Sequence, residues 1–231
     1  MTLQEFIFGA YPYLAGTVFL AGSLLRFERE QYTWKSDSTQ LLSKTGVRLA
    51  SNLFHVGIIA IFFGHLFGML LPHSAFAALG VSDTGHQYLA IIAGVIFGTM
   101  TLVGGLMLFI RRITNARVRA AGRSRDAFTI FWLVATVTLG LSTIPTSLGH
   151  AAHDDPTTML LLIDWVKSVG TLHPNPALIA PVDTIYKIHI FFGMTIFLMF
   201  PFTRLVHIWS VPFGYLTRAY QLVRIKRIAA R

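Results

Sequence analysis

The sequence predicts an all-α integral membrane bundle of five transmembrane helices, with the N-terminus outside and the C-terminus cytoplasmic. Three observations predict this fold class. Hydrophobic residues make up 54% of the chain and charged residues only 13%, against roughly 25% charged in a typical soluble domain. Five apolar stretches are long enough to cross a bilayer, and basic residues gather in alternate connections between them. We therefore expect one membrane domain over residues 1–211 and a basic tail over residues 212–231.

Each predicted span satisfies the length that a bilayer requires, which is about 20 apolar residues for a core of about 30 Å. The first is not expected to be a secretory signal, because Glu5 stands where a basic segment belongs and no small-residue cleavage site follows. The fourth begins beside Asp126, which suits a helix N-terminus. The fifth contains Pro201, which predicts a kink. The predicted spans are 6–25, 49–71, 88–110, 127–148 and 185–209.

The basic residues predict the orientation, because cytoplasmic connections hold an excess of Lys and Arg. The connection 26–48 has five, 111–125 has six and the tail after Pro212 has five. The connection 72–87 has none, and 149–184 has only Lys167. This one-sided distribution accounts for the net charge of +9, so nucleic-acid binding is not expected. We expect the basic tail to meet anionic lipid or a cytoplasmic protein partner.

The chain contains no cysteine. This excludes disulfides, thiolate metal sites, covalently attached c-type haem and an iron–sulfur cluster held by this chain. Any such cluster in a functional assembly would belong to a partner subunit.

Four of the nine histidines lie inside predicted spans, where burial of an ionisable group indicates function. The second span holds His55 and His65, and the fifth holds His189 and His207. Because these spans run in opposite directions, His55 pairs in depth with His207 at the inner side, and His65 with His189 at the outer side. The other histidines fall in or beside outer connections, where we expect solvated imidazoles. They are His73, His86, His150, His153 and His173.

Two haem groups stacked across the bilayer would use such pairs as axial ligands, and with both axial positions filled their role would be electron relay. On continuous helices the ligands would be separated along the axis by about 15 Å in the second span and about 27 Å in the fifth. Arg204 either offsets a haem propionate or extends to the interface. Small residues beside the histidines leave room for a flat macrocycle, although the same pattern also serves close helix packing. They are Gly57, Ala60, Gly64, Gly68 and Gly193.

Two further roles for the four histidines stay open. A metal transporter or proton path is one, and structural hydrogen bonding is the other. No predicted span has Asp or Glu in its middle, which favours haem over a permeating cation. The stretch HAAHDD at 150–155 is interpreted as a solvated connection and not as a metal site.

Several longer motifs are similar to those of the respiratory nitrate reductase gamma subunit, and the resemblance covers nearly the whole chain. The GH and HIWSVP elements around His65 and His207 are its most specific parts. The motifs are YPYLAGTVFLAGSLLRF (11–27), QYTWKSDSTQ (31–40), SNLFHVGI and GHLFGMLLPH (within 51–73), GLSTIP (140–145) and FPFTRLVHIWSVPFGYLTRAYQLVR (200–224).

The resemblance implies a di-haem cytochrome b with two haem b groups. It implies that His55 and His207 ligate the inner haem, and His65 and His189 the outer one. Ubiquinol or menaquinol would be oxidised near the outer haem, where the family's pocket points to Gly64, His65 and His86. The segment 74–87 departs from the family pattern, because His86 stands where we expect a lysine.

The resemblance also implies the partners and the membrane. Protons would leave to the outside, while electrons would pass to an iron–sulfur beta subunit and then to an alpha subunit with a molybdenum cofactor, where nitrate is reduced. The membrane would be the cytoplasmic membrane of a prokaryote. The alternatives are a related cytochrome b of a sulfur-metabolism or heterodisulfide reductase complex, and a non-redox anchor or transporter.

Overall fold

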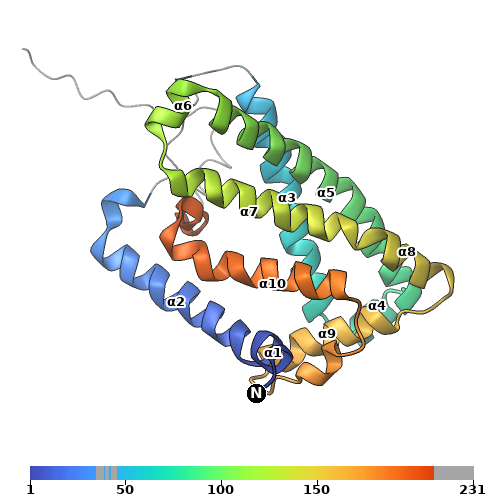
Figure 1. The fold of residues 1–231 in the computed structure, drawn as a ribbon. Coiled ribbons are helices and arrows are strands. Elements are labelled where there is room, and N and C mark those ends of the chain that lie inside the picture. The colour runs from blue at the N-terminus through green and yellow to red at the C-terminus, as the bar shows by residue number, and fades with distance from the viewer. Residues whose placement is uncertain (35–38, 40–41, 43–45, 211–231) are drawn as a thin grey trace, which may run out of the picture.

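The computed structural model describes residues 1–34, 39, 42 and 46–210, and all regular elements within these residues are helical (Figure 1). The predicted tail, 212–231, lies outside the described residues. Five helical segments are long and apolar enough to cross a membrane, as the sequence predicts. They are Leu3–Arg29, Val47–Leu70, Asp83–Thr114, Ser124–Ala152 and Thr184–Phe202.

The first span consists of α1 (Leu3–Glu5), a π-helical turn η1 (Phe6–Ala10) and α2 (Tyr11–Arg29). It starts with a capping box, in which the Thr2 hydroxyl accepts from the Glu5 N–H and the Glu5 carboxylate accepts from the Thr2 N–H. Pro12 has no N–H to donate to the carbonyl of Phe8. The indole N–H of Trp165 donates to that carbonyl at 2.9 Å, so a residue of the outer connection satisfies it.

The second and third spans are α3 (Val47–Leu70) and α5 (Asp83–Thr114), joined by the short α4 (His73–Ala78). These two helices pack very closely. A Cβ added to Gly57 would lie 2.8 Å from the carbonyl oxygen of Phe97, and one added to Gly104 would lie 2.5 Å from the backbone nitrogen of Phe54. Gly57 therefore serves helix packing, which corrects the expectation that it leaves room for a macrocycle.

We expect Gly104→Ala to destabilise the bundle by about 1–3 kcal/mol, because the added methyl group would force the backbones of α3 and α5 apart. Thermal unfolding of the detergent-solubilised protein would measure the loss. Gly149→Ala is the matched control, since a Cβ there meets nothing within 4 Å. Equal unfolding temperatures for the two variants would contradict the packing argument.

The fourth span comprises α7 (Ser124–Ser142) and α8 (Ile144–Ala152), with α6 (Ala116–Ala121) in the connection before it. The outer connection after it holds α9 (Thr157–Gly170) and a 3-10 turn, η3 (Pro176–Ile179). This connection packs against the first and fifth spans through a buried apolar cluster. Its members are Phe8, Leu162, Trp165, Ile179, Val182 and Tyr186.

The fifth span is α10 (Thr184–Met199), which lies between α2 and α7 (Figure 1). The chain continues as 3-10 turns, η4 (Phe200–Phe202) and η5 (Arg204–Ser210). The prediction of one helix over 185–209 is therefore wrong beyond Met199, and Pro201 explains the break because it cannot donate a helical hydrogen bond. The estimate of about 27 Å between the ligands of this span assumed a continuous helix and fails with it.

Candidate functional site

The structure brings the four intramembrane histidines together in the two pairs that the helix directions predict. The imidazole ring centres of His55 (α3) and His207 (η5) lie 6.3 Å apart, with 71° between the ring planes. Those of His65 (α3) and His189 (α10) lie 6.2 Å apart, with 47° between the planes. The first pair joins the second span to η5, just beyond the fifth span, and the second pair joins the second span to the fifth.

The two separations fit coordination of one metal ion by both rings of a pair. Two metal–nitrogen bonds of about 2 Å, and about 1 Å from each nitrogen to its ring centre, give roughly 6 Å between the centres. Two rings that only pack against each other can also lie closer together, so packing alone does not require a separation of about 6 Å. Each ring-centre separation is therefore long enough for one metal ion to bind between the two rings of a pair.

Each of the four imidazoles is oriented through Nδ1 by a backbone carbonyl. A carbonyl oxygen can only accept, so Nδ1 carries the proton and Nε2 keeps its lone pair for a metal. Metal-binding histidines commonly have such a partner for the second nitrogen. The acceptors for His55, His65, His189 and His207 are the carbonyls of Ser51, Ile61, Thr136 and Arg204, at 2.7, 2.9, 3.1 and 2.6 Å.

Within the described part of the chain, no group of three or more His, Asp or Glu side chains could hold a metal ion. Each pair thus supplies two nitrogen ligands, and an ion bound there would need its remaining ligands from another molecule. A porphyrin supplies four in one plane, which leaves two axial positions for a histidine pair. The donor set therefore fits haem better than a bare cation.

The small residues near the pairs have different surroundings. A Cβ added to Gly64 or Gly193 would meet nothing within 4 Å, so neither glycine serves a close helix contact within the chain. Gly140 of α7, which the sequence analysis did not name as a site residue, makes room for the ring of His189. A Cβ at Gly140 would lie 2.9 Å from Cε1 of that ring. Gly68 lies against Nε2 of His86 instead, at 3.5 Å from its added Cβ.

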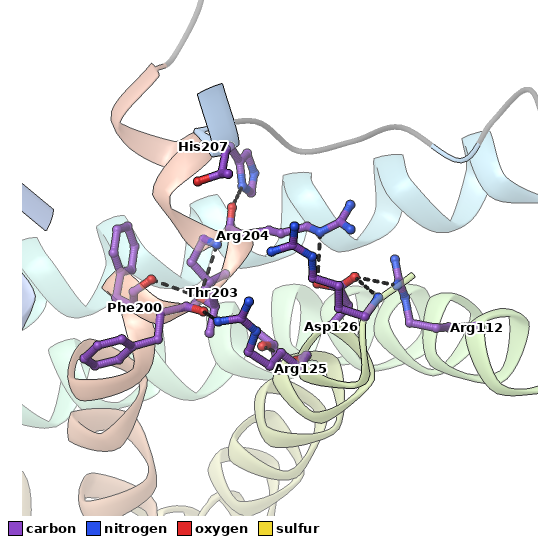
Figure 2. Close-up of polar contacts among 12 residues, drawn as sticks. Arg112, Arg125, Asp126, Phe200, Thr203, Arg204 and His207 are labelled. Atoms are coloured by element: carbon purple, nitrogen blue, oxygen red, sulfur yellow. Dashed lines mark hydrogen bonds and ion pairs between the residues drawn. The ribbon is translucent and has the colours of Figure 1, made fainter. Parts of the chain in front are cut away.

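At the end of the bundle that the basic residues predict to be the inner one, Asp126 forms two ion pairs that sequence reasoning missed (Figure 2). Its Oδ1 lies 2.9 Å from Nε of Arg204, and its Oδ2 lies 3.0 Å from a terminal nitrogen of Arg112. Arg204 was expected to meet a propionate or to extend to the interface, and here its Nε edge binds Asp126. The sequence signal that could have indicated these ion pairs is Asp126 itself, an acidic residue among the arginines of this boundary.

At the opposite end of the bundle, His86 is only 7% exposed, which corrects the expectation of a solvated imidazole. It lies in the first turns of α5, and its ring stacks on Phe76 with 3.9 Å between ring centres. Its Nε2 faces Gly68, which is one turn beyond Gly64 and His65 on α3. His86 therefore lies against Gly68, one helical turn from Gly64 on α3, whereas His65 faces His189 of α10.

Buried polar groups continue from His86 into neighbouring helices. The next residue, Gln87, is also buried and donates from its side-chain amide to the carbonyl of Ser147 at 3.1 Å. The hydroxyls of Ser147 and Tyr186 lie 2.7 Å apart, which links α8 to α10 one turn before His189. Polar side chains thus line the outer end of the bundle beside the outer histidine pair.

The remaining histidines of known position are not brought together as a site. The Nε2 atom of His150 lies 3.8 Å from Oδ2 of Asp183. His153 and His173 are exposed, and each bonds through Nδ1 to a nearby carbonyl. Asp155 beside them is exposed, and hydrogen bonds from Thr157 lower the pKa of its carboxyl. Residues 153–155 are exposed, as the sequence predicts, whereas His150 and Ala151 belong to α8 and are partly or fully buried.

Five candidate spans, with two histidine pairs between α3 and the α10–η5 segment, define a multi-pass helical membrane protein. The chain belongs to the nitrate reductase gamma subunit family, whose family model matches residues 4–226. This confirms the family resemblance found in the sequence, and a gamma chain is by name one subunit of a multi-subunit nitrate reductase.

Individual relatives match over almost their whole length. The chain is 46% identical to the respiratory nitrate reductase 2 gamma chain of Escherichia coli (strain K12), over 97% of this chain and 98% of that one. It is 47% identical to the respiratory nitrate reductase 1 gamma chain of the same organism, with the same coverage. It is 31% identical to the nitrate reductase gamma chain of Bacillus subtilis (strain 168), over 95% of this chain and 97% of that one.

Proposed function

We propose that this protein is the membrane cytochrome b subunit of a respiratory nitrate reductase complex. It oxidises quinol near the outer face, releases protons there, and passes electrons inward. The observation that carries the proposal is the pair of imidazole separations, 6.3 and 6.2 Å, with every Nδ1 bonded to a carbonyl. Two bound haem b groups would supply one-electron redox chemistry.

The chain's own residues would hold and orient these groups. His55 and His207 would bind the inner haem through Nε2, and His65 and His189 the outer one. With an imidazole on each side, neither iron would keep an open position for oxygen or nitrate, which restricts the site to electron relay. The guanidinium of Arg204 would also offset the charge of an inner-haem propionate while its Nε binds Asp126.

Quinol would bind beside the outer pair, at Gly64, His65 and His86. A buried imidazole can donate a hydrogen bond to a quinol oxygen or accept its proton, and His86 has the burial that such a role requires. The polar side chains of Gln87, Ser147 and Tyr186 would assist proton release toward the outer side. Ubiquinol and menaquinol both fit this chemistry.

The orientation and partners follow from the charge distribution and the family. The basic connections would face the cytoplasm, which places the N-terminus outside the cytoplasmic membrane of a prokaryote. The basic tail, 212–231, would dock to the iron–sulfur beta subunit, which delivers electrons to the alpha subunit with its molybdenum cofactor. The relatives' names favour this assembly over a sulfur-metabolism or heterodisulfide reductase complex.

Spectroscopy of the purified protein would test the function. A pyridine haemochrome assay should find two haem b per chain, and a quinol analogue should reduce both. Zero or one haem would overturn the proposal and leave the anchor or transporter alternative. Co-purification of a molybdenum subunit would separate nitrate chemistry from sulfur chemistry.

For His86→Ala we expect both haems to be retained and quinol turnover to fall on the order of tenfold or more, because a buried proton acceptor is lost. Stopped-flow haem reduction by a quinol analogue would measure the rate. His153→Ala is the control, since this side chain is exposed in the outer connection. Unchanged kinetics in His86→Ala would remove His86 from the quinol site.

A further inference from the structure

The carboxylate of Asp126 joins three parts of the bundle at its inner end. Asp126 lies in the first turn of α7 and is 8% exposed. It accepts from Arg112 at the end of α5, from the backbone N–H of Arg123 at 3.0 Å, and from Nε of Arg204 in η5 at 2.9 Å (Figure 2). A carboxylate with this burial is stabilised only while its partners stay in place, so the contacts are mutually dependent.

One of these partners belongs to the segment that orients an inner histidine. The carbonyl of Arg204 accepts from Nδ1 of His207 at 2.6 Å, the shortest of the four imidazole contacts (Figure 2). The guanidinium of Arg204 binds Asp126 while its backbone orients His207. A single residue therefore connects the carboxylate to the ring.

His207 depends on this connection more than the other three histidines do. The carbonyls that orient His55 and His65 lie four residues earlier in the same long helix, and the one that orients His189 lies in α7. His207 follows the break at Pro201, in 3-10 turns where regular α-helical hydrogen bonds no longer hold the backbone.

Side chains from other helices hold this segment instead. Arg26 of α2 donates to the carbonyls of Pro201 and Thr203, at 2.7 and 2.6 Å. Arg125 of α7 reaches the carbonyl of Phe202 at 3.5 Å. These contacts precede Arg204, so the ion pair with Asp126 is the contact nearest to His207 among those that tie the segment to α7.

We propose that Asp126 is a positioning residue for the inner ligand His207 and acts through Arg204. The inference rests on the proposed haem-binding function and adds to it a residue that touches neither haem nor quinol. Its two carboxylate oxygens have separable roles. The Arg204 side sets the orientation of the His207 ring, and the Arg112 side fastens α5 to α7.

The test compares variants of the full chain in its complex. Asp126→Asn keeps the size of the side chain and removes its charge. Low-spin ferric haem gives an electron paramagnetic resonance signal that depends on the relative orientation of its two axial rings, and second-sphere contacts tune its midpoint potential. We expect Asp126→Asn to shift both properties of the inner haem and neither property of the outer haem.

Two further variants distinguish positioning from general packing. Arg204→Gln should reproduce the shift of Asp126→Asn, and the double variant should shift no further than either single one. Arg112→Gln removes the other ion pair and should lower the unfolding temperature with the inner-haem signal unchanged. Asp183→Asn is the matched control, because Asp183 also stands at the start of a spanning helix but at the outer end.

Two results would overturn the inference. One is an unchanged inner-haem signal in Asp126→Asn, whatever Arg204→Gln does, and the other is an equal shift in Arg112→Gln. If Asp126→Asn fails to fold, Asp126→Glu decides in its place, because it keeps the charge and Arg204 but moves the carboxylate, and an unchanged inner-haem signal in that variant would overturn the inference. Wild-type protein with two haems and unshifted variants would refute only this inference, whereas wild-type protein without haem would refute the proposed function itself.

Discussion

Replacement of His189 by alanine is expected to remove the outer haem and to abolish quinol oxidation. The ring of His189 lies 6.2 Å from that of His65, and no other described histidine pairs with His65. Loss of one axial nitrogen leaves an iron with a single protein ligand. The loss of activity should exceed the roughly 10- to 100-fold that changes in second-sphere contacts cause.

A pyridine haemochrome assay should fall from two haems per chain to one in His189→Ala, and the same haem should be missing in His65→Ala. His173→Ala serves as the control, because its exposed ring lies in the outer connection. Retention of both haems in either ligand variant would contradict the outer pairing.

Replacement of His207 by alanine is expected to produce the opposite pattern. The inner haem should be lost and the outer haem should still be reduced by a quinol analogue, because His65 and His189 are untouched. Nitrate reduction driven by quinol should then fall by more than about 100-fold, since the inward route is interrupted. Nitrate reduction driven by an artificial donor to the cytoplasmic subunits should continue.

His55→Ala provides the matched test of the inner pair. Because the rings of His55 and His207 lie 6.3 Å apart, both variants should lose the same haem and show the same difference spectrum. If His55→Ala lost the haem that His65→Ala loses, the pairs would run along α3 instead of between α3 and the fifth span, and the site geometry would be wrong.

Much of this architecture was predictable because it depends on local properties of the chain. The lengths of apolar runs determine the spans, and each predicted span corresponds to one found in the structure. The alternating direction of successive spans requires His55 and His207 to lie at one depth and His65 and His189 at the other. Neither inference needs any knowledge of how the side chains pack.

The end of the fifth span shows where sequence reasoning was insufficient. Pro201 predicts a distortion, but a kinked helix and a terminated helix are both compatible with one proline. The helix ends here, and Arg26 from the first span donates to the carbonyl of Pro201 just beyond that end, a contact between residues 175 positions apart. The place of His207 relative to His55 follows from that ending.

The sequence by itself determined the helical fold class, the five candidate spans, the family and which of the four histidines lie in pairs, because hydrophobic length and chain direction are properties of single segments. Only the tertiary structure decided that His86 is buried, that Gly57 serves helix packing, and that Asp126 binds Arg204. Those facts depend on which side chains meet across different helices. The free energy of such contacts comes from packing and charge between segments that are far apart in the sequence, so a local sequence pattern does not predict it.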